Sequence, residues 1–331
     1  MNKKLTINDI AKLSNVSKAT VSFYLNGKYE KMSENTKNKI GEVIKSSGYK
    51  PSAVARTLSI KESRIIGVII GDICKGYANQ FVKGIMDYAN KEGYQIILAS
   101  SEYDIKKEIK HVNNMKSMNV DGFIVQPTIH FNYWLEKNNH NLPVVFFDSP
   151  TIYNNNMWVK TNNYEAVYEA CEELVKKNYE QYILISADPK VLVTRLERTL
   201  GFTNCLDIHG KSYDTFILDE YSSVDMIKEK IDQYLLENKK TCIFICNNWL
   251  LSKMYKVIKM YKEHIPSKLG VIGFDSLEWT ELISPKITTI VQPAYDEGVK
   301  AASILIDSLE NRNKESKQQV LDCSVNWGES T

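Results

Sequence analysis

The chain of 331 residues lacks any apolar run that approaches the roughly 20 residues a membrane-spanning helix needs. Its strongest apolar run, residues 65–71, has the length of a buried strand. Lys3 and Lys4 stand at the N-terminus, but the segment then turns polar, which is not the pattern of a secretory signal peptide. We therefore expect a cytoplasmic protein with no membrane partner.

Cysteine is scarce, and its spacing excludes the common cysteine-based sites. No zinc-type or disulfide-scaffold pattern is present, so we expect no metal ion. Cys242 and Cys246 lie in an apolar run and are predicted to fill a core. Reduced thiols agree with a cytoplasmic location. The six cysteines are Cys74, Cys171, Cys205, Cys242, Cys246 and Cys323.

Signatures of catalysis are missing as well. The chain has no Gly-x-Gly-x-x-Gly, no phosphate loop, no Gly-x-Ser-x-Gly and no His-Glu-x-x-His. Its five histidines show no metal-ligand spacing. We therefore predict neither an enzyme nor a cofactor. An enzyme stays open only as a cleft whose catalytic residues follow no motif.

The strongest local pattern lies in residues 6–26. Thr6 can cap a helix, with Asp9 near its N-terminal end, and Ser17 can cap a second helix after a break at Asn15. Two short helices joined by so tight a turn are typical of a helix-turn-helix, whose second helix enters the DNA major groove. An ordinary pair of helices fits the local pattern equally. The predicted buried faces are Ile7, Ile10, Ala11 and Ser14, then Val21, Tyr24 and Leu25.

The charge distribution favours the DNA-binding interpretation. Residues 1–60 contain eleven lysines and arginines against four acids, a net charge of +7. The whole chain carries +2, so residues 61–331 carry −5. A basic module on an acidic body suits a polyanionic partner for the module alone.

A third helix and a weaker fourth segment follow. Ser33 is predicted to cap a helix that ends at Gly48 and whose apolar residues Ile40, Val43 and Ile44 cover the first two helices. Residues 52–59 are predicted to form a short helix, and a helix of this length is marginal alone in water. It is either a linker or a segment that folds on a partner.

The head contains four further motifs, namely Val16-Ser17-Lys18-Ala19-Thr20-Val21-Ser22, Leu25-Asn26-Gly27, Gly48-Tyr49-Lys50-Pro51 and Ala53-Val54-Ala55-Arg56-Thr57-Leu58. These motifs resemble the lactose-repressor (LacI/GalR) family of bacterial transcriptional regulators, and the resemblance extends over nearly the whole chain. It implies a homodimer that binds double-stranded operator DNA under the control of a small-molecule effector, a sugar or sugar derivative. In that family residues 52–59 correspond to a hinge helix that folds only on operator DNA, with Leu58 wedged into the minor groove.

From Arg64 the sequence alternates between strands and helices. Strands are predicted at residues 65–70, 95–99, 120–126, 144–147, 182–186, 215–218, 242–246, 271–274 and 288–291. Helices are predicted at 79–92, 105–118, 164–177, 224–236 and 250–262, and a surface loop at 310–319. Such alternation is typical of parallel sheets covered by helices on both faces. So many strands favour two lobes.

The predicted fold is therefore a small all-α helix-turn-helix head on a two-lobed α/β body like that of periplasmic binding proteins. The predicted domains are 1–50 for DNA binding, 51–61 for the hinge helix and linker, and 62–331 for effector binding and dimerisation. Lys18, Ala19 and Phe23 are expected to face the bases. The full predicted DNA-binding set is Thr6, Ser17, Lys18, Ala19, Thr20, Ser22, Phe23, Asn26, Ala55 and Leu58.

Polar residues after strand-like runs predict the effector site, because ligands of such folds bind outside the carboxyl ends of the strands. A guanidinium, carboxylates, amides and aromatic rings suit a hydroxyl-rich ligand. The alternatives are helix caps for Asp148 and Asn248, and a surface ion pair for Arg198. The predicted ligand-binding set is Lys75, Tyr77, Phe147, Asp148, Arg198, Asn247, Trp249 and Asp275.

The sequence departs from the family pattern at three places. Lys75-Gly76 replaces the usual Asn-Pro, and Asn247-Asn248 replaces Asn-Asp, so a negatively charged ligand is one hypothesis. Phe23 stands where the family usually has arginine, which leaves the usual operator sequence in doubt. The chain is thus predicted to be a repressor of a sugar-utilisation operon. A solute-binding protein, or an α/β enzyme with a DNA-binding head, is the alternative.

Overall fold

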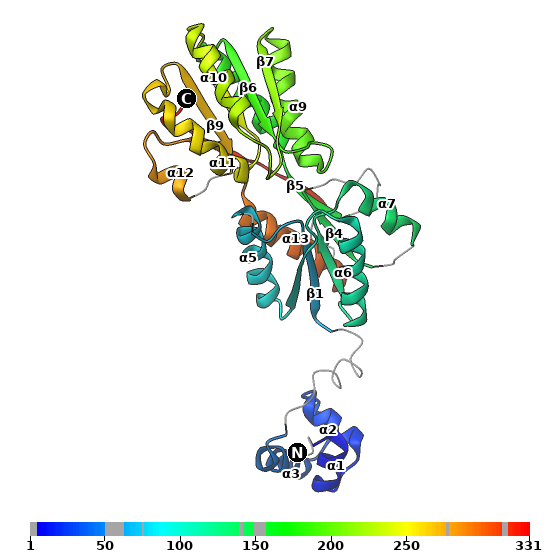
Figure 1. Ribbon diagram of the computed structural model, residues 1–331. Coiled ribbons are helices and arrows are strands. Elements are labelled where there is room, and N and C mark those ends of the chain that lie inside the picture. Colours follow the sequence, from blue (N-terminus) through cyan, green and yellow to red (C-terminus); the bar gives the residue numbers. More distant parts are fainter. Residues whose placement is uncertain are drawn as a thin grey trace. The chain divides into compact units, whose positions relative to one another are not determined.

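The computed structural model describes residues 5–49, 63–74, 76–138, 142–148, 157–275, 278–312 and 317–331 (Figure 1). The chain divides into two compact units, Met1–Ser63 and Arg64–Thr331. The predicted hinge at 51–61, with Ala55 and Leu58, lies outside the described residues, and so does Lys75. No helix in the described ranges has the length and apolarity to span a bilayer.

The first unit is a three-helix head whose helices begin at the predicted caps. α1 (Ile7–Ser14) opens with a capping box between Thr6 and Asp9. α2 (Lys18–Leu25) begins after Ser17, whose hydroxyl accepts from the Thr20 amide at 3.1 Å. The short 3-10 helix η1 (Tyr29–Lys31) leads to α3 (Glu34–Ser47), which ends at Gly48. The buried core consists of Ile10, Ala11, Val21 and Ile40.

The second unit contains two six-stranded sheets, which define lobe 1 and lobe 2. In lobe 1 the strand order is β11-β5-β4-β3-β1-β2, and in lobe 2 it is β12-β10-β9-β8-β6-β7. Every pair among the described strands is parallel except β10 with β12. Lobe 1 contains β1 (Ile65–Ile70), β2 (Gln95–Ser100), β3 (Gly122–Val125), β4 (Val144–Phe147), β5 (Met157–Thr161) and β11 (Gln318–Leu321). Lobe 2 contains β6 (Gln181–Ser186), β7 (Ser212–Ile217), β8 (Thr241–Ile245), β9 (Leu269–Phe274), β10 (Thr288–Val291) and β12 (Ser324–Asn326).

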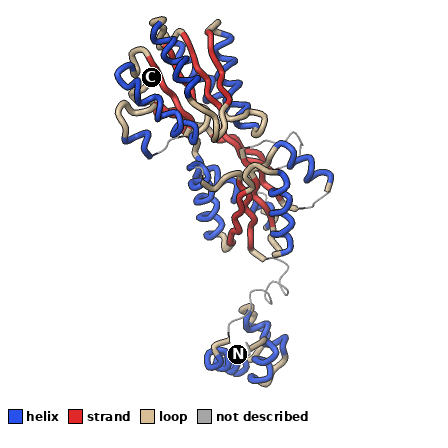
Figure 2. Tube along the Cα trace, viewed as in Figure 1, coloured by secondary structure: helices blue, strands red, loops and turns tan. Residues whose placement is uncertain are grey.

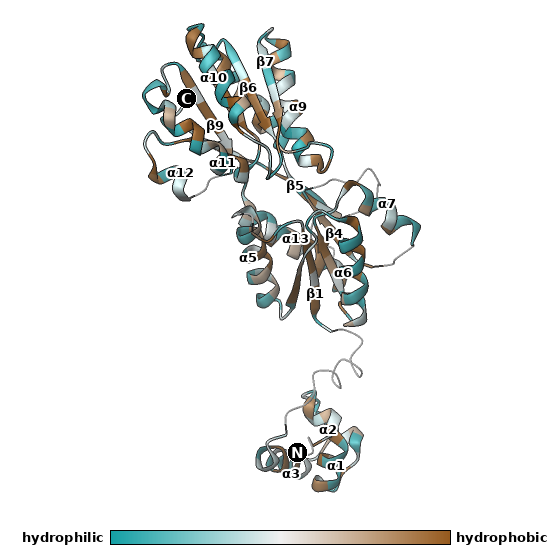
Figure 3. Ribbon diagram, in the orientation of Figure 1, coloured by the Kyte–Doolittle hydropathy of each residue, from teal (hydrophilic) through white to brown (hydrophobic). Residues whose placement is uncertain are grey.

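Helices cover both faces of each sheet, as Figure 2 shows. In lobe 1, α5 (Gly76–Lys91) and α13 (Ala294–Leu309) bury one face, and α6 (Ile105–Ser117) and α7 (Ile129–Lys137) bury the other. In lobe 2, α8 (Asn163–Lys176) and α9 (Val193–Ile208) lie opposite α10 (Asp225–Leu236) and α11 (Asn248–Ile258). The central strands β1, β3, β4, β6, β8 and β9 are mostly apolar because both of their faces are buried (Figure 3). The 3-10 helix η2 (Lys259–His264) and α12 (Glu278–Leu282) complete lobe 2.

The chain passes between the lobes three times, after β5, after β10 and after β11. Side-chain hydrogen bonds link the first crossing to each of the other two. Thr161 Oγ1 donates to Gln292 Oε1 at 3.0 Å, and Asn162 Nδ2 donates to Asp322 Oδ1 at 3.0 Å. These three crossings, linked by hydrogen bonds at one place, form the hinge between the lobes.

The structure contains all nine predicted strands, and it also contains elements that we did not predict. α13 is buried all round from Ala301 to Asp307, and its first two turns carry the charged residues Asp296 and Glu297. β5 is short and alternates buried with half-buried residues, and β11 begins at Gln318, inside the predicted loop 310–319. The remaining elements that we missed are α7, α9, α12 and β12.

Candidate functional site

The exposed side of α2 carries the residues predicted to read DNA bases. Lys18 and Ala19 are exposed, and Phe23 is half-buried beneath the Lys31 ammonium, which lies 4.9 Å from its ring centre. The hydroxyls of Ser17 and Thr20 are hydrogen-bonded to each other at 2.8 Å. This face therefore presents one cation, one small residue and one aromatic ring within two helical turns.

The other predicted DNA-binding hydroxyls and amides hold the ends of the helices. Thr6 belongs to the α1 capping box, and its hydroxyl donates to Asp9 at 2.7 Å. Asn26 caps the C-terminus of α2 and donates to Ser22 Oγ at 3.4 Å. These side chains position α2, and their contacts with phosphate stay predictions.

In the second unit, the predicted effector residues meet at the carboxyl ends of the strands. Asp148 directly follows β4 and Asp275 directly follows β9, both with a left-handed backbone, at φ 59° and 66°. A cavity of about 60 Å³, here the inner site, lies between the two lobes. Its lining includes six of the eight predicted residues, namely Tyr77, Asp148, Arg198, Asn247, Trp249 and Asp275.

Arg198 supplies a buried positive charge to the inner site. It projects from α9 and is 6% exposed, which rules out the alternative of a surface ion pair. Its Nε donates to Asn163 Oδ1 at 2.8 Å, and its Nη1 donates to the Cys246 carbonyl at 3.1 Å. These bonds fix the guanidinium before any ligand arrives.

Two glutamines, each of which follows a strand, orient the carboxylates. Gln126 donates to Asp148 Oδ2 at 2.8 Å, and Gln292 donates to Asp275 Oδ1 at 2.9 Å. Burial raises the pKa of Asp148 to about 6, although the nearby Arg198 guanidinium opposes the rise. Burial also raises the pKa of Asp275, again against the effect of Arg198.

A third buried carboxyl stands behind the site. Tyr77 donates its hydroxyl to Glu297 Oε2, and Glu297 is 0% exposed. Burial raises the pKa of Glu297 and that of Tyr77 well above their usual values. Glu297 Oε1 and Asp148 Oδ1 are both buried without a hydrogen-bond partner. The inner site thus holds more acceptors than its own donors satisfy.

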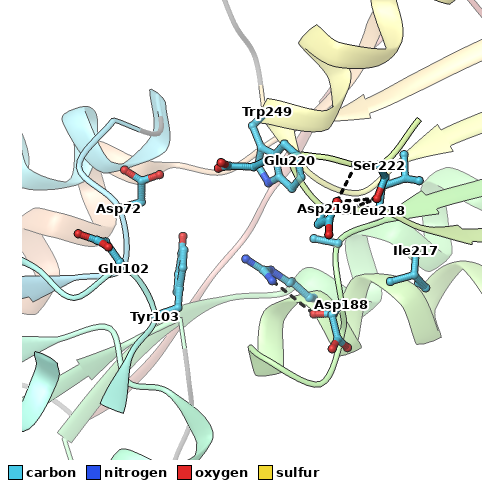
Figure 4. A pocket seen from close by; sticks show the side chains of 12 residues that line it. Asp72, Glu102, Tyr103, Asp188, Ile217, Leu218, Asp219, Glu220, Ser222 and Trp249 are labelled. Carbon is cyan, nitrogen blue, oxygen red and sulfur yellow. Dashed lines mark hydrogen bonds between the residues drawn. The ribbon is translucent and has the colours of Figure 1, made fainter. Parts of the chain in front are cut away.

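A larger cavity of about 590 Å³, here the outer chamber, shares Tyr103, Arg195 and Trp249 with the inner site. Arg195, from lobe 2, lies 5.2 Å from the centre of the Tyr103 ring of lobe 1. Figure 4 shows Tyr103 on one side of the chamber and Trp249 on the other. The two cavities are therefore neighbours in the cleft, and Arg198 lines the inner one.

Phe147 does not fulfil its predicted role as a wall of the site. It is 1% exposed and stacks on Phe81 at 3.9 Å between ring centres, within the core of lobe 1. It is the last residue of β4, and strand residues alternate between faces, so its ring points into the sheet cover while Asp148 reaches the cleft. Asn248 is the first residue of α11 and Asn247 holds the N-cap position, so Asn248 is not the predicted helix cap.

Sequence reasoning missed Gln126, Gln292, Tyr103, Arg195 and Glu297. Gln292 directly follows the predicted strand 288–291, so the rule that found Asp148 could have found it. Gln126 was predicted as the last residue of the strand 120–126, whereas the structure ends β3 at Val125. The other three lie on helices or in a loop, and no motif marks them. In the described ranges no group of three or more His, Cys, Asp or Glu could hold a metal ion.

Comparison with known proteins agrees with both units. Residues 6–52 match the bacterial regulatory proteins of the lacI family, and residues 66–313 match the periplasmic binding protein domain. The probable HTH-type transcriptional regulator EndR of Paenibacillus polymyxa is 30% identical, over 95% of this chain and 93% of its own. The ribose operon repressor of Halalkalibacterium halodurans is 30% identical, over 93% and 91%.

A solved structure shows the same fold along the whole chain. The lac repressor dimer bound to operator and the anti-inducer ONPF superposes with a TM-score of 0.81 at 20% identity. The match covers 99% of both chains. At that identity the likeness concerns the fold alone.

Proposed function

The chain belongs to the lacI family of bacterial regulatory proteins, and on that basis we propose that it is a cytoplasmic, dimeric repressor of a sugar-utilisation operon. Its head binds double-stranded operator DNA, and a small saccharide in the cleft between the lobes controls that binding. The role requires no catalysis. Whether the saccharide releases or promotes DNA binding follows from which lobe arrangement it prefers.

The observation that carries the effector role is the convergence on one cavity of residues from four separate elements. Arg198 comes from α9, Asn247 from the end of β8, and Asp148 and Asp275 from the ends of β4 and β9. Both lobes contribute, and the three bonded crossings lie beside them. A ligand that bonds both lobes at once biases the hinge, which links the cleft to the rest of the chain.

DNA binding by the head rests on the helix-turn-helix, the +7 charge of residues 1–60 and the exposed face of α2. Phosphate contacts by such a head should give a log-log salt slope of about −0.9 per neutralised charge. In this proposal Leu58 and Ala55 enter the minor groove, and Leu58→Ala loses specific affinity while non-specific affinity stays near that of the wild type.

Two measurements test the proposal. Selection from a random duplex pool should yield a palindromic site for the full chain, whereas residues 61–331 alone should bind no DNA. Asp275→Ala should then retain the site but lose the response to saccharides that shift the wild type. Glu263→Ala, an exposed residue of η2, is the control and should respond normally. A full chain that selects no sequence would contradict the proposal.

A further inference from the structure

The outer chamber is the part of the cleft large enough for the body of a ligand. The inner site, at about 60 Å³, has room for one or two polar groups, since a water occupies about 30 Å³. The chamber, at about 590 Å³, falls in the usual range for ligand pockets, roughly 300–1,000 Å³. The chemistry of the chamber therefore decides which class of molecule enters.

That chemistry is acidic. Among the described residues that line the chamber, Arg195 is the one cation, against the five carboxyls of Asp72, Glu102, Asp188, Asp219 and Glu220. Two lysines stand nearby: Lys107 pairs with Glu102, and Lys253 donates to the Asp219 and Glu220 carbonyls. The five carboxyls outnumber these three cations. Figure 4 shows carboxylates on both sides of the chamber.

The inner site adds an unsatisfied acceptor. Its described lining holds the carboxyls of Asp148 and Asp275 and the guanidiniums of Arg195 and Arg198. Asp148 is 5% exposed and lines the cavity, yet its Oδ1 has no hydrogen-bond partner. A buried acceptor left without a donor costs about 1–3 kcal/mol, so a ligand that brings donors recovers that cost.

The walls of the chamber suit a ring with a positive charge. Tyr103 and Trp249 line both cavities, and the Arg195 guanidinium already lies over the Tyr103 ring. An ammonium group is attracted to an aromatic face in the same way, and most strongly to tryptophan. The apolar face of a sugar ring can stack on the same surfaces.

We propose that the effector is an amine-bearing saccharide, whose ring lies between Tyr103 and Trp249 and whose donor groups reach Asp148. This rests on the proposed function, since it names the ligand class of the same cleft. It replaces the hypothesis of a negatively charged ligand, because the described lining of the outer chamber has five carboxyls and one guanidinium. Sugar phosphates and uronic acids should be excluded by charge.

Three disaccharides with one skeleton test the charge directly. The chitosan disaccharide carries two free amines, N,N′-diacetylchitobiose carries the same groups neutralised, and cellobiouronic acid carries a carboxylate. Calorimetry on the full chain at about pH 7, where an amine with a pKa of about 8 is mostly protonated, should rank them in that order. We expect the chitosan disaccharide to bind at least tenfold tighter than the diacetyl form. Added salt should reduce this difference in affinity.

Variants locate the effect. Glu220→Gln and Glu102→Gln should each weaken the chitosan disaccharide by about three- to tenfold and leave the diacetyl form unchanged. Glu263→Gln, on the surface, should change neither. Equal or tighter binding of the diacetyl or uronic form, or no binding of the amine form, would overturn the inference. Loss of sequence-specific DNA binding would instead contradict the proposed function, so the two failures are distinguishable.

Discussion

The guanidinium carbon of Arg198 lies 3.6 Å from the centre of the Phe274 ring. Phe274 is the last residue of β9, and the next residue is Asp275. The same strand end thus supplies the surface on which the cation rests and one of the carboxylates that it faces. Stacking and hydrogen bonds together hold Arg198 in one place, as a preorganised site requires.

Arg198→Met should destabilise the second unit strongly. Removal of the cation leaves the buried carboxylates of Asp148 and Asp275 without the positive charge that opposes their burial penalty, at a cost of about 3–5 kcal/mol. The loss should be smaller at about pH 5 than at about pH 7, because the carboxyls take up protons as the pH falls. Urea midpoints at both pH values measure it. The control is Arg195→Met, which changes a half-buried residue of the same helix and should reduce the stability less. An equal loss of stability in the two variants would contradict this account.

The base-reading prediction concerns Lys18 and Phe23. Phe23→Arg should shift the preferred site towards guanine, because arginine bonds guanine with two hydrogen bonds whereas phenylalanine reaches apolar edges such as the thymine methyl. Lys18→Ala should also change the preferred sequence. Lys39→Ala, exposed on α3, is a charge-matched control and should weaken binding without a change of sequence. Selection from a random pool decides, and unchanged preferences in both α2 variants would refute the assignment.

Glu108 should make lobe 1 less stable as the pH rises. It is 0% exposed on α6, and its two oxygens accept from the Thr128 amide at 2.8 Å and the Thr128 hydroxyl at 2.7 Å. Burial raises its pKa from 4.5 to about 7. The folded state therefore binds more protons between these values, and stability falls across that window by about 3 kcal/mol.

Glu108→Gln keeps the shape of the protonated form and should remove that part of the pH dependence. The variant should equal the wild type near pH 4.5 and be more stable than it above about pH 7. Glu136→Gln, exposed on α7, is the control. Thermal unfolding across the range measures the difference between variant and wild type. A constant difference at all pH values would show that Glu108 does not titrate as described.

The crossing of α5 and α13 should tolerate no added atom. A Cβ on Gly298 would lie 2.1 Å from the Phe81 carbonyl oxygen, and one on Gly84 would lie 2.1 Å from that of Tyr295. Gly298→Ala should therefore cost about 1–3 kcal/mol or more, since both obstacles are backbone atoms. Ser308→Ala, on the exposed side of α13, should change the urea midpoint little. A neutral Gly298→Ala would mean that the helices can separate.

The sequence predicted the parts of the site that follow a local rule. Buried parallel strands are continuous apolar runs, so their ends can be read directly, and Asp148, Asn247 and Asp275 were found in this way. Tyr103 and Arg195 come together across the cleft only through the arrangement of the lobes. Phe147 was misplaced because the end of a strand does not tell which face its last side chain occupies. Glu297 lies on the buried face of α13, where the helical period predicts an apolar side chain and not a carboxyl.

The three crossings have a consequence for synthesis on the ribosome. Residues 65–161 of lobe 1 emerge first, but α13, which covers half of one face of their sheet, follows only after residues 163–291 have been made. Lobe 2 by then lacks only its edge strand β12. Synthesis of lobe 1 therefore begins before that of lobe 2, but lobe 1 cannot complete its fold until α13 has been made. Its apolar strands stay exposed for most of translation. Nascent chains should depend on chaperones mainly through lobe 1.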